Sequence, residues 1–159
     1  MEGVVLRLPL TYGPGVKGNF LVLLEAIAKG RRLPFAGVAN RRSLLYVGNA
    51  VSAIDIALRS PAVVGETLPI ADAESVSTPD LIVKIARPLG TSPRLSRLPT
   101  SILRAGAALM GRRGASTRLL GSLEVDAARF CELAQWTPPT VLDDGIRATV
   151  AWWRMQHAL

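Results

Sequence analysis

The sequence predicts an α/β domain in which short strands alternate with amphipathic helices. Apolar residues make up 49% of the 159 residues, and a chain of about this length buries roughly 70% of the surface that its unfolded form exposes. Short apolar or β-branched runs alternate with segments of helical periodicity, and these segments begin at capping residues and end at glycine or proline. The composition and the alternation together favour one ordered domain with its own core.

The first predicted strand covers residues 4–8, stops at Pro9 and precedes the turn signal Tyr12-Gly13-Pro14-Gly15. The run is apolar on both faces, which is typical of a strand inside a parallel sheet. Almost no sequence precedes it, so we expect its neighbouring strands to have been cut away. An edge left open in this way should pair with another copy, swap or be disordered.

The remaining elements follow from periodicity and from caps. Asn19 is the expected cap of the first helix and Gly30 its end, while Thr78 followed by Pro79 starts a later helix. We predict helices over 19–29, 49–59, 78–87, 101–110, 116–120, 126–133 and 141–155, and extended segments over 33–37, 43–47, 66–71, 94–98 and 123–125.

The net charge of +7 is carried mostly by arginine, whose planar guanidinium binds phosphate oxygens in pairs. Nucleic acid, anionic lipid and a sugar nucleotide are therefore all candidate partners. Nucleic acid is disfavoured because none of the eight aromatic residues is interleaved with a basic run. No run reaches the ~20 apolar residues that cross a membrane. Cys131 is the single cysteine, so no internal disulfide is possible and we expect a cytoplasmic protein.

An ordered set of segments begins with Arg-Leu-Pro-Leu-Thr-Tyr-Gly-Pro-Gly at 7–15. It continues with Gly-Asn-Phe at 18–20, Leu-Pro-Phe-Ala-Gly at 33–37, Arg-Arg-Ser-Leu-Leu-Tyr-Val-Gly-Asn-Ala at 41–50 and Gln-Trp-Thr-Pro at 135–138. In order and spacing these segments resemble extended short-chain dehydrogenases that act on nucleotide sugars, the NAD-dependent epimerase/dehydratase family.

The resemblance implies an α/β fold that corresponds to the C-terminal part of an extended Rossmann-type dehydrogenase. This part is a small mixed sheet with helices, and the N-terminal Rossmann unit is missing. Residues 1–15 would be a remnant of the last Rossmann strands, and residues 16–159 would form the nucleotide-sugar binding domain.

The motifs that carry cofactor binding and catalysis in the family do not occur in this sequence. No Gly-rich turn opens a helix, and neither Tyr12 nor Tyr46, the only tyrosines, has a lysine four residues further on. The resemblance therefore implies that NAD or NADP is bound by the missing half of the intact parent, that this chain alone binds neither tightly, and that it holds no catalytic residue.

The site residues follow from the resemblance. Leu8 and Pro9 align with residues near the nicotinamide, Leu10 with one that faces the sugar, and Pro34 and Ala36 with the segment that edges the uracil. Asn19 and Phe20 would direct backbone amides at the diphosphate, and Arg42 would grip it, with Arg118 as a second phosphate-facing arginine. Arg41 replaces Arg42 if the register slips by one residue. The alternative for Asn19 is a plain helix cap that needs no ligand, and the alternative for Arg42 is a solvated loop arginine.

The sequence departs from the family at two positions, and the first bears on the sugar. Leu10 replaces a residue that is often asparagine, which favours a deoxy or N-acetylated sugar, and Asn49 stands where the family often has aspartate. The sequence leaves three functions open: a fragment of a UDP-sugar epimerase, dehydratase or polysaccharide 4-reductase, a stand-alone binding module without catalysis, and a nucleic-acid binder. Self-association through the first strand or the helices is also expected.

Overall fold

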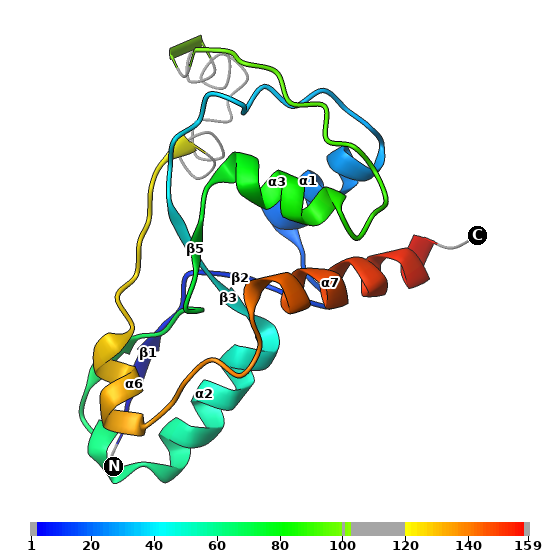
Figure 1. Cartoon of the computed structure of the whole chain (residues 1–159). Coiled ribbons are helices and arrows are strands. Elements are labelled where there is room, and N and C mark those ends of the chain that lie inside the picture. The colour runs from blue at the N-terminus through cyan, green and yellow to red at the C-terminus, as the bar shows by residue number, and fades with distance from the viewer. Residues whose placement is uncertain (1–2, 100, 103–119, 158–159) are drawn as a thin grey trace.

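The computed structural model describes residues 3–99, 101–102 and 120–157 (Figure 1). Most of the helix predicted at 101–110, the segment 116–119 and the candidate Arg118 lie outside the described residues. The strands are β1 (Val5–Arg7), β2 (Leu10–Tyr12), β3 (Arg42–Tyr46), β4 (Thr67–Pro69) and β5 (Ser75–Val76). The helices are α1 (Gly18–Ala28), α2 (Val47–Arg59), η1 (Pro61–Val63, a 3₁₀ helix), α3 (Thr78–Ala86), α6 (Ala128–Ala134) and α7 (Leu142–His157).

The strands form two small sheets. β1 pairs with β4 in parallel, and the second sheet has the order β2-β3-β5, with β2 parallel and β5 antiparallel to β3. The sequence predicted a strand that stops at Pro9 and then a turn, so β2 was missed. Pro9 interrupts the extended chain because it has no amide to donate, and the chain then resumes pairing beside Leu44–Tyr46.

Two hydrophobic cores lie on opposite sides of β3. Leu44 belongs to the core that contains α1, α3 and α7, and Leu45 to the core formed by α2, β4 and α6. Neighbouring residues on a strand point to opposite faces, and both leucines are fully buried, so β3 separates the two cores. In Figure 1, α1 and α3 accordingly lie above the strands, and α2 and α6 lie below them.

A buried polar network around Asp72 joins four elements. The Tyr12 hydroxyl donates to Asp72 Oδ2 at 3.2 Å, the Tyr46 amide donates to both carboxylate oxygens, and Asn49 Nδ2 donates to Asp72 Oδ1 at 2.7 Å. Asn49 also exchanges hydrogen bonds with the Thr140 backbone just before α7. Burial raises the pKa of Asp72, and burial together with this carboxylate raises the pKa of the Tyr12 phenol. The network holds β2, β3, α2 and the start of α7 in one arrangement.

Several predicted boundaries move. α3 is capped by Ser77, whose hydroxyl accepts from the Asp80 amide at 3.2 Å, and Thr78 is its first residue instead of its cap. Residues 94–98 form no strand but only isolated bridges, Leu33 with Leu95 and Phe35 with Arg97. The extended segment predicted at 33–37 is likewise absent as a strand, because turns at 34 and at 36–37 interrupt it and leave only these single bridges.

The β1 strand is less buried than the sequence predicted. β4 lies along one edge, no strand pairs with the other edge in the described part of the chain, and Val5 is 56% exposed. The open edge that the sequence predicted is therefore present among the described residues. The pattern of a fully buried strand is not realised, because Val5 and Arg7 are exposed on one face and Leu6 on the other is only half-buried, against the core that contains Leu45. The segment is ordered as a strand, so disorder is not the outcome in this structure.

Candidate binding site

A cavity of about 500 Å³ opens between β2, β3, the first turn of α1 and the start of α3. Six of the residues predicted for the site line it: Leu8, Pro9, Leu10, Asn19, Phe20 and Arg42. Residues that the sequence did not single out also line it, among them Lys17, Thr78, Leu81 and Leu123. The cavity therefore joins an apolar wall of leucines to a cationic rim.

The first turn of α1 supplies part of that rim. The cap is Lys17 and not Asn19, as the sequence predicted: Lys17 has extended φ and ψ of −126° and −179°, makes no side-chain cap hydrogen bond, and is followed by no acidic residue in the first turn. The amides of Gly18 and Asn19 have no acceptor within the described residues. The N-terminus of α1 therefore combines uncapped backbone amides, the positive end of the helix dipole and the charge of Lys17.

Phe20 lines the cavity but is almost entirely buried. The residue is 2% exposed, and its ring stacks on Tyr12 with centroids 5.4 Å apart, as part of the core beneath the cavity. This anchor fixes the start of α1 relative to β2, which is the physical reason that the amide end of the helix lies at the cavity.

Arg42 lies at the beginning of β3 and lines the same cavity. Its Nη1 donates to the carbonyl of Gly121 at 2.9 Å, and no carboxylate pairs with it in the described part of the chain. Burial lowers the pKa of its guanidinium, which nevertheless remains charged because arginine does not lose its proton in proteins. A half-buried cation without an anionic partner is suited to an anionic ligand.

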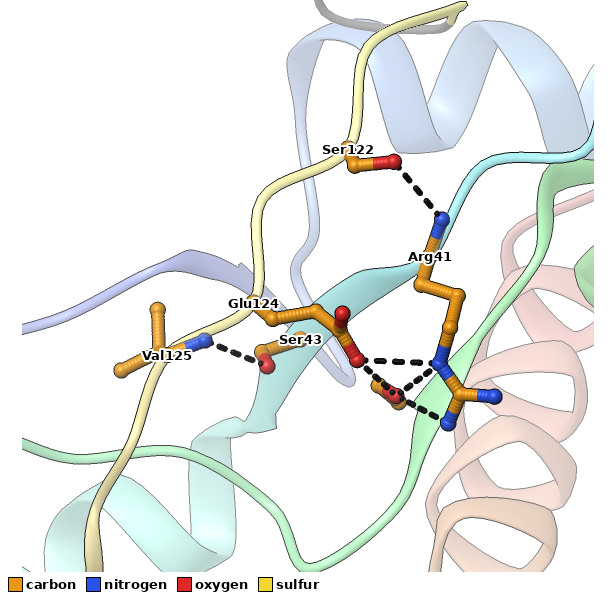
Figure 2. Close-up of polar contacts among 6 residues, drawn as sticks. Arg41, Ser43, Ser122, Glu124 and Val125 are labelled. Atoms are coloured by element: carbon orange, nitrogen blue, oxygen red, sulfur yellow. Dashed lines mark hydrogen bonds and ion pairs between the residues drawn. The ribbon is translucent and has the colours of Figure 1, made fainter.

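Arg41, the alternative to Arg42, points to a different set of partners (Figure 2). Its Nε donates to Glu124 Oε1 at 2.9 Å and to Ser75 Oγ at 3.1 Å, and its Nη2 donates to the same Ser75 oxygen at 2.7 Å. Arg41 is absent from the residues that line the cavity. The structure therefore brings Arg42, and not Arg41, together with the start of α1.

Two other predicted residues lie apart from this group. Pro34 and Ala36 do not line the cavity; they belong to the loop after α1, where the Ala36 amide donates to the Ser96 carbonyl at 3.1 Å. Arg118 is outside the described residues.

Among the cavity residues that sequence reasoning missed, Lys17 and Leu123 were missed for different reasons. Lys17 could have been found from the sequence, because it lies two residues before Asn19 and no acidic residue in the first turn of α1 balances its charge. Leu123 could not have been found in this way, since it reaches the cavity through a bridge to Arg42, which is distant in the sequence. No group of three or more potential metal ligands exists among the described residues. None of their helices is long and apolar enough to cross a membrane.

The chain is similar in sequence to two curated proteins, whereas no protein-family model matches it. It is 32% identical over 150 residues to UDP-glucose 4-epimerase of Vibrio cholerae. The matched region covers 94% of this chain and 46% of that protein. It is 25% identical over 164 residues to ceramide reductase of Caulobacter vibrioides, covering 96% of this chain and 51% of that protein. The chain thus spans about half the length of the curated relatives it matches.

Solved structures share the fold. UDP-glucose 4-epimerase of Thermotoga maritima, solved with UDP-glucose, superposes with a TM-score of 0.71 at 19% identity, covering 99% of this chain and 47% of that one. UDP-glucuronic acid 4-epimerase of Bacillus cereus, solved with UDP-glucuronic acid and NAD, gives a TM-score of 0.73 at 21% identity, covering 96% and 45%. At these identities the likeness establishes the fold alone, and it covers less than half of each enzyme.

Proposed function

Since this chain belongs to the NAD-dependent epimerase/dehydratase family of extended short-chain dehydrogenases, we propose that it forms the nucleotide-sugar binding part of such an enzyme. In this proposal residues 16–159 bind the nucleotide sugar, and residues 1–15 are a remnant of the last Rossmann strands. The ligand is a UDP-sugar or a similar nucleotide sugar.

One observation supports the proposal: Arg42 and the amide end of α1 line the same cavity. A diphosphate needs positive charge and several donors within reach, and these two elements supply both. The apolar wall offers a surface for the remainder of the ligand, because small-molecule sites combine apolar contacts with a few placed polar groups.

The chain is proposed not to catalyse alone. Its sequence contains neither a Gly-rich turn at a helix start nor a Tyr-x-x-x-Lys pair, so it lacks the groups that cradle a dinucleotide and transfer a proton in the family. NAD or NADP supplies hydride chemistry when bound by the intact parent. Leu8 and Pro9 line the cavity and offer this cofactor only apolar contact, which fits a nicotinamide edge but not a phosphate.

Calorimetric titration with UDP, UMP and uridine tests the binding proposal. We expect UDP to bind most tightly, since it alone carries two phosphates. Arg42→Ala should weaken UDP about tenfold or more, because hydrogen bonds to charged groups contribute about 1.5–3 kcal/mol. The control is Arg59→Ala, which removes an exposed arginine paired with Asp55 far from the cavity. Equal affinity for UDP and uridine, or no loss in the Arg42 variant, contradicts the proposal.

The sugar is proposed to be deoxy or N-acetylated, because Leu10 offers the cavity an apolar side chain. In the same titration, UDP-N-acetylglucosamine should bind more tightly than UDP-glucose, and the reverse order rejects this refinement. A reductase parent is the second candidate reaction. It is supported by the similarity to a relative that is named a reductase.

A stand-alone binding module is the alternative of another class. It is distinguished by the coding sequence upstream of Met1. An in-frame Gly-rich turn and Tyr-x-x-x-Lys pair there identify an enzyme, whereas an unrelated upstream sequence supports the module.

A further inference from the structure

A short segment, residues 121–125, runs along the first residues of β3, and we name it the strap. The Ser43 amide donates to the Leu123 carbonyl at 2.8 Å, and the Leu123 amide donates to the Arg41 carbonyl at 2.9 Å. The Val125 amide donates to Ser43 Oγ at 2.9 Å (Figure 2). The strap is thus attached to β3 by backbone and side-chain hydrogen bonds on both sides of Leu123.

The strap also builds the cavity. Leu123 lines it, and the carbonyl of Gly121 accepts the hydrogen bond from Arg42 Nη1. One wall of the cavity and the orientation of its half-buried cation therefore depend on the same five residues. If the strap lifts from β3, Leu123 and the partner of Arg42 leave together.

A charged anchor on the outer side holds the strap. Arg41 and Arg42 are neighbours at the start of β3, so their side chains leave the chain on opposite sides. Arg42 faces the cavity, whereas Arg41 pairs with Glu124 of the strap and with Ser75 of β5, and the Ser75 hydroxyl also donates to Glu124 Oε1 at 3.1 Å. The hydrogen bond from Arg41, followed by that from Ser75, lowers the pKa of Glu124, which keeps this carboxylate charged.

We propose that Arg41, Ser75 and Glu124 are positioning residues that clamp the strap onto β3 and β5 and thereby orient Arg42 toward the phosphates of the bound ligand. The inference rests on the proposed nucleotide-sugar site. Because strap docking and ligand binding both favour the same placement of Arg42, each stabilises the other, and the coupling is reciprocal.

The test compares Glu124→Gln with Glu66→Gln in the 159-residue chain. Both substitutions break an exposed Arg–Glu pair that joins two segments, since Glu66 pairs with Arg129 at 3.1 Å, away from the cavity. We expect Glu124→Gln to weaken UDP binding about two- to fivefold, the range for an exposed pair, and to speed hydrogen exchange at the Ser43 and Leu123 amides. UDP should slow exchange at these two amides in the wild type.

The sign of the UDP effect separates positioning from simple charge. Glu124→Gln removes a negative charge near an anion site, so long-range electrostatics alone strengthens UDP binding. Weaker binding of UDP by Glu124→Gln therefore indicates that the contacts holding the strap have been lost. The swap Arg41→Glu with Glu124→Arg restores a pair and should recover exchange protection at Leu123 relative to Arg41→Glu alone.

The outcomes separate the two proposals. If the wild type does not bind UDP, the proposed function fails, whereas the exchange comparison still reports whether the clamp holds the strap. If the wild type binds UDP and Glu124→Gln binds it equally or more tightly, the positioning role is overturned. Equal thermal unfolding of both glutamine variants shows that neither result arises from misfolding.

Discussion

At the residue scale, Lys17 carries a positive charge at the end of a helix that disfavours it. The N-terminus of α1 has the positive end of the helix dipole, and Lys17 provides no oxygen to accept from its free amides. A residue that opposes local stability in this way is expected where binding needs it. Lys17 lines the same cavity as Arg42.

Stability and binding should therefore change in opposite directions at this position. Lys17→Asp supplies a cap oxygen and a favourable charge, so it should stabilise the chain by about 1 kcal/mol, or raise its Tm by about 2–4 °C. The same variant should weaken UDP binding, because it places a carboxylate at the phosphate site. Thermal unfolding and calorimetry measure the two effects.

The control for this variant is Lys29→Asp, at the other end of α1, where the same charge change opposes the dipole and is far from the cavity. It should lower the Tm and leave UDP binding unchanged. Unchanged affinity in Lys17→Asp would show that this lysine does not face the ligand.

At the element scale, the hydrogen bonds of Asn49 give a physical reason for asparagine at a position where the family often has aspartate. It is fully buried at the start of α2, where its amide donates to Asp72 and to the Thr140 carbonyl, and its oxygen accepts from the Thr140 amide. Only a side chain with both donor and acceptor satisfies these partners. An aspartate here would face the Asp72 carboxylate at the distance of a hydrogen bond.

Asn49→Asp should therefore destabilise the chain by about 2–4 kcal/mol at pH 7, because two buried carboxylates repel each other and a donor is lost. Repulsion and burial raise the pKa of the new carboxyl above its unfolded value. The penalty is therefore present above that raised pKa and declines as the pH falls toward about 4.

Urea unfolding of wild type and variant at pH 7 and pH 4.5 measures this change. The free-energy difference between the two chains should be smaller at pH 4.5. A difference that is constant with pH would assign the cost to packing and not to charge. Asn49→Ser, which introduces no charge, is the matched control for a constant difference.

At the scale of the whole molecule, exposed apolar surface points to association. Val51, Ile54 and Leu58 share one face of α2 at helical spacing, and Leu58 is 80% exposed. β1 also carries the exposed Val5, and one of its edges has no pairing strand among the described residues. Exposed apolar patches and unpaired strand edges are characteristic of protein–protein contact sites.

We therefore expect the 159-residue chain to self-associate as its concentration rises, and the double variant Val51→Lys with Leu58→Lys to shift it toward the monomer. Light scattering during gel filtration reports the mass. Met155→Lys, which replaces a single exposed apolar residue at the end of α7, should not change the mass distribution. A wild-type chain that stays monomeric at high concentration would rule out association through these surfaces.

Much of this molecule was predictable from residues close together in the chain. Periodicity placed α1, α2, α3 and α7 near their observed ranges, and the ordered motif segments pointed to the residues that line the cavity from β2, α1 and β3. The misplaced caps at Asn19 and Thr78 were errors of two residues and one residue. At α3 the neighbouring Ser77 hydroxyl accepts from the helix amide in place of Thr78, whereas no side chain caps α1.

What the sequence by itself determined were the elements and the chemistry available to them, because helical periodicity, caps and turns depend on residues within about four positions. Only the tertiary structure decided that Arg42 faces the cavity while Arg41 is held by Glu124, and that Leu123 closes one wall. These outcomes depend on contacts between residues about eighty positions apart, and no local pattern encodes such contacts.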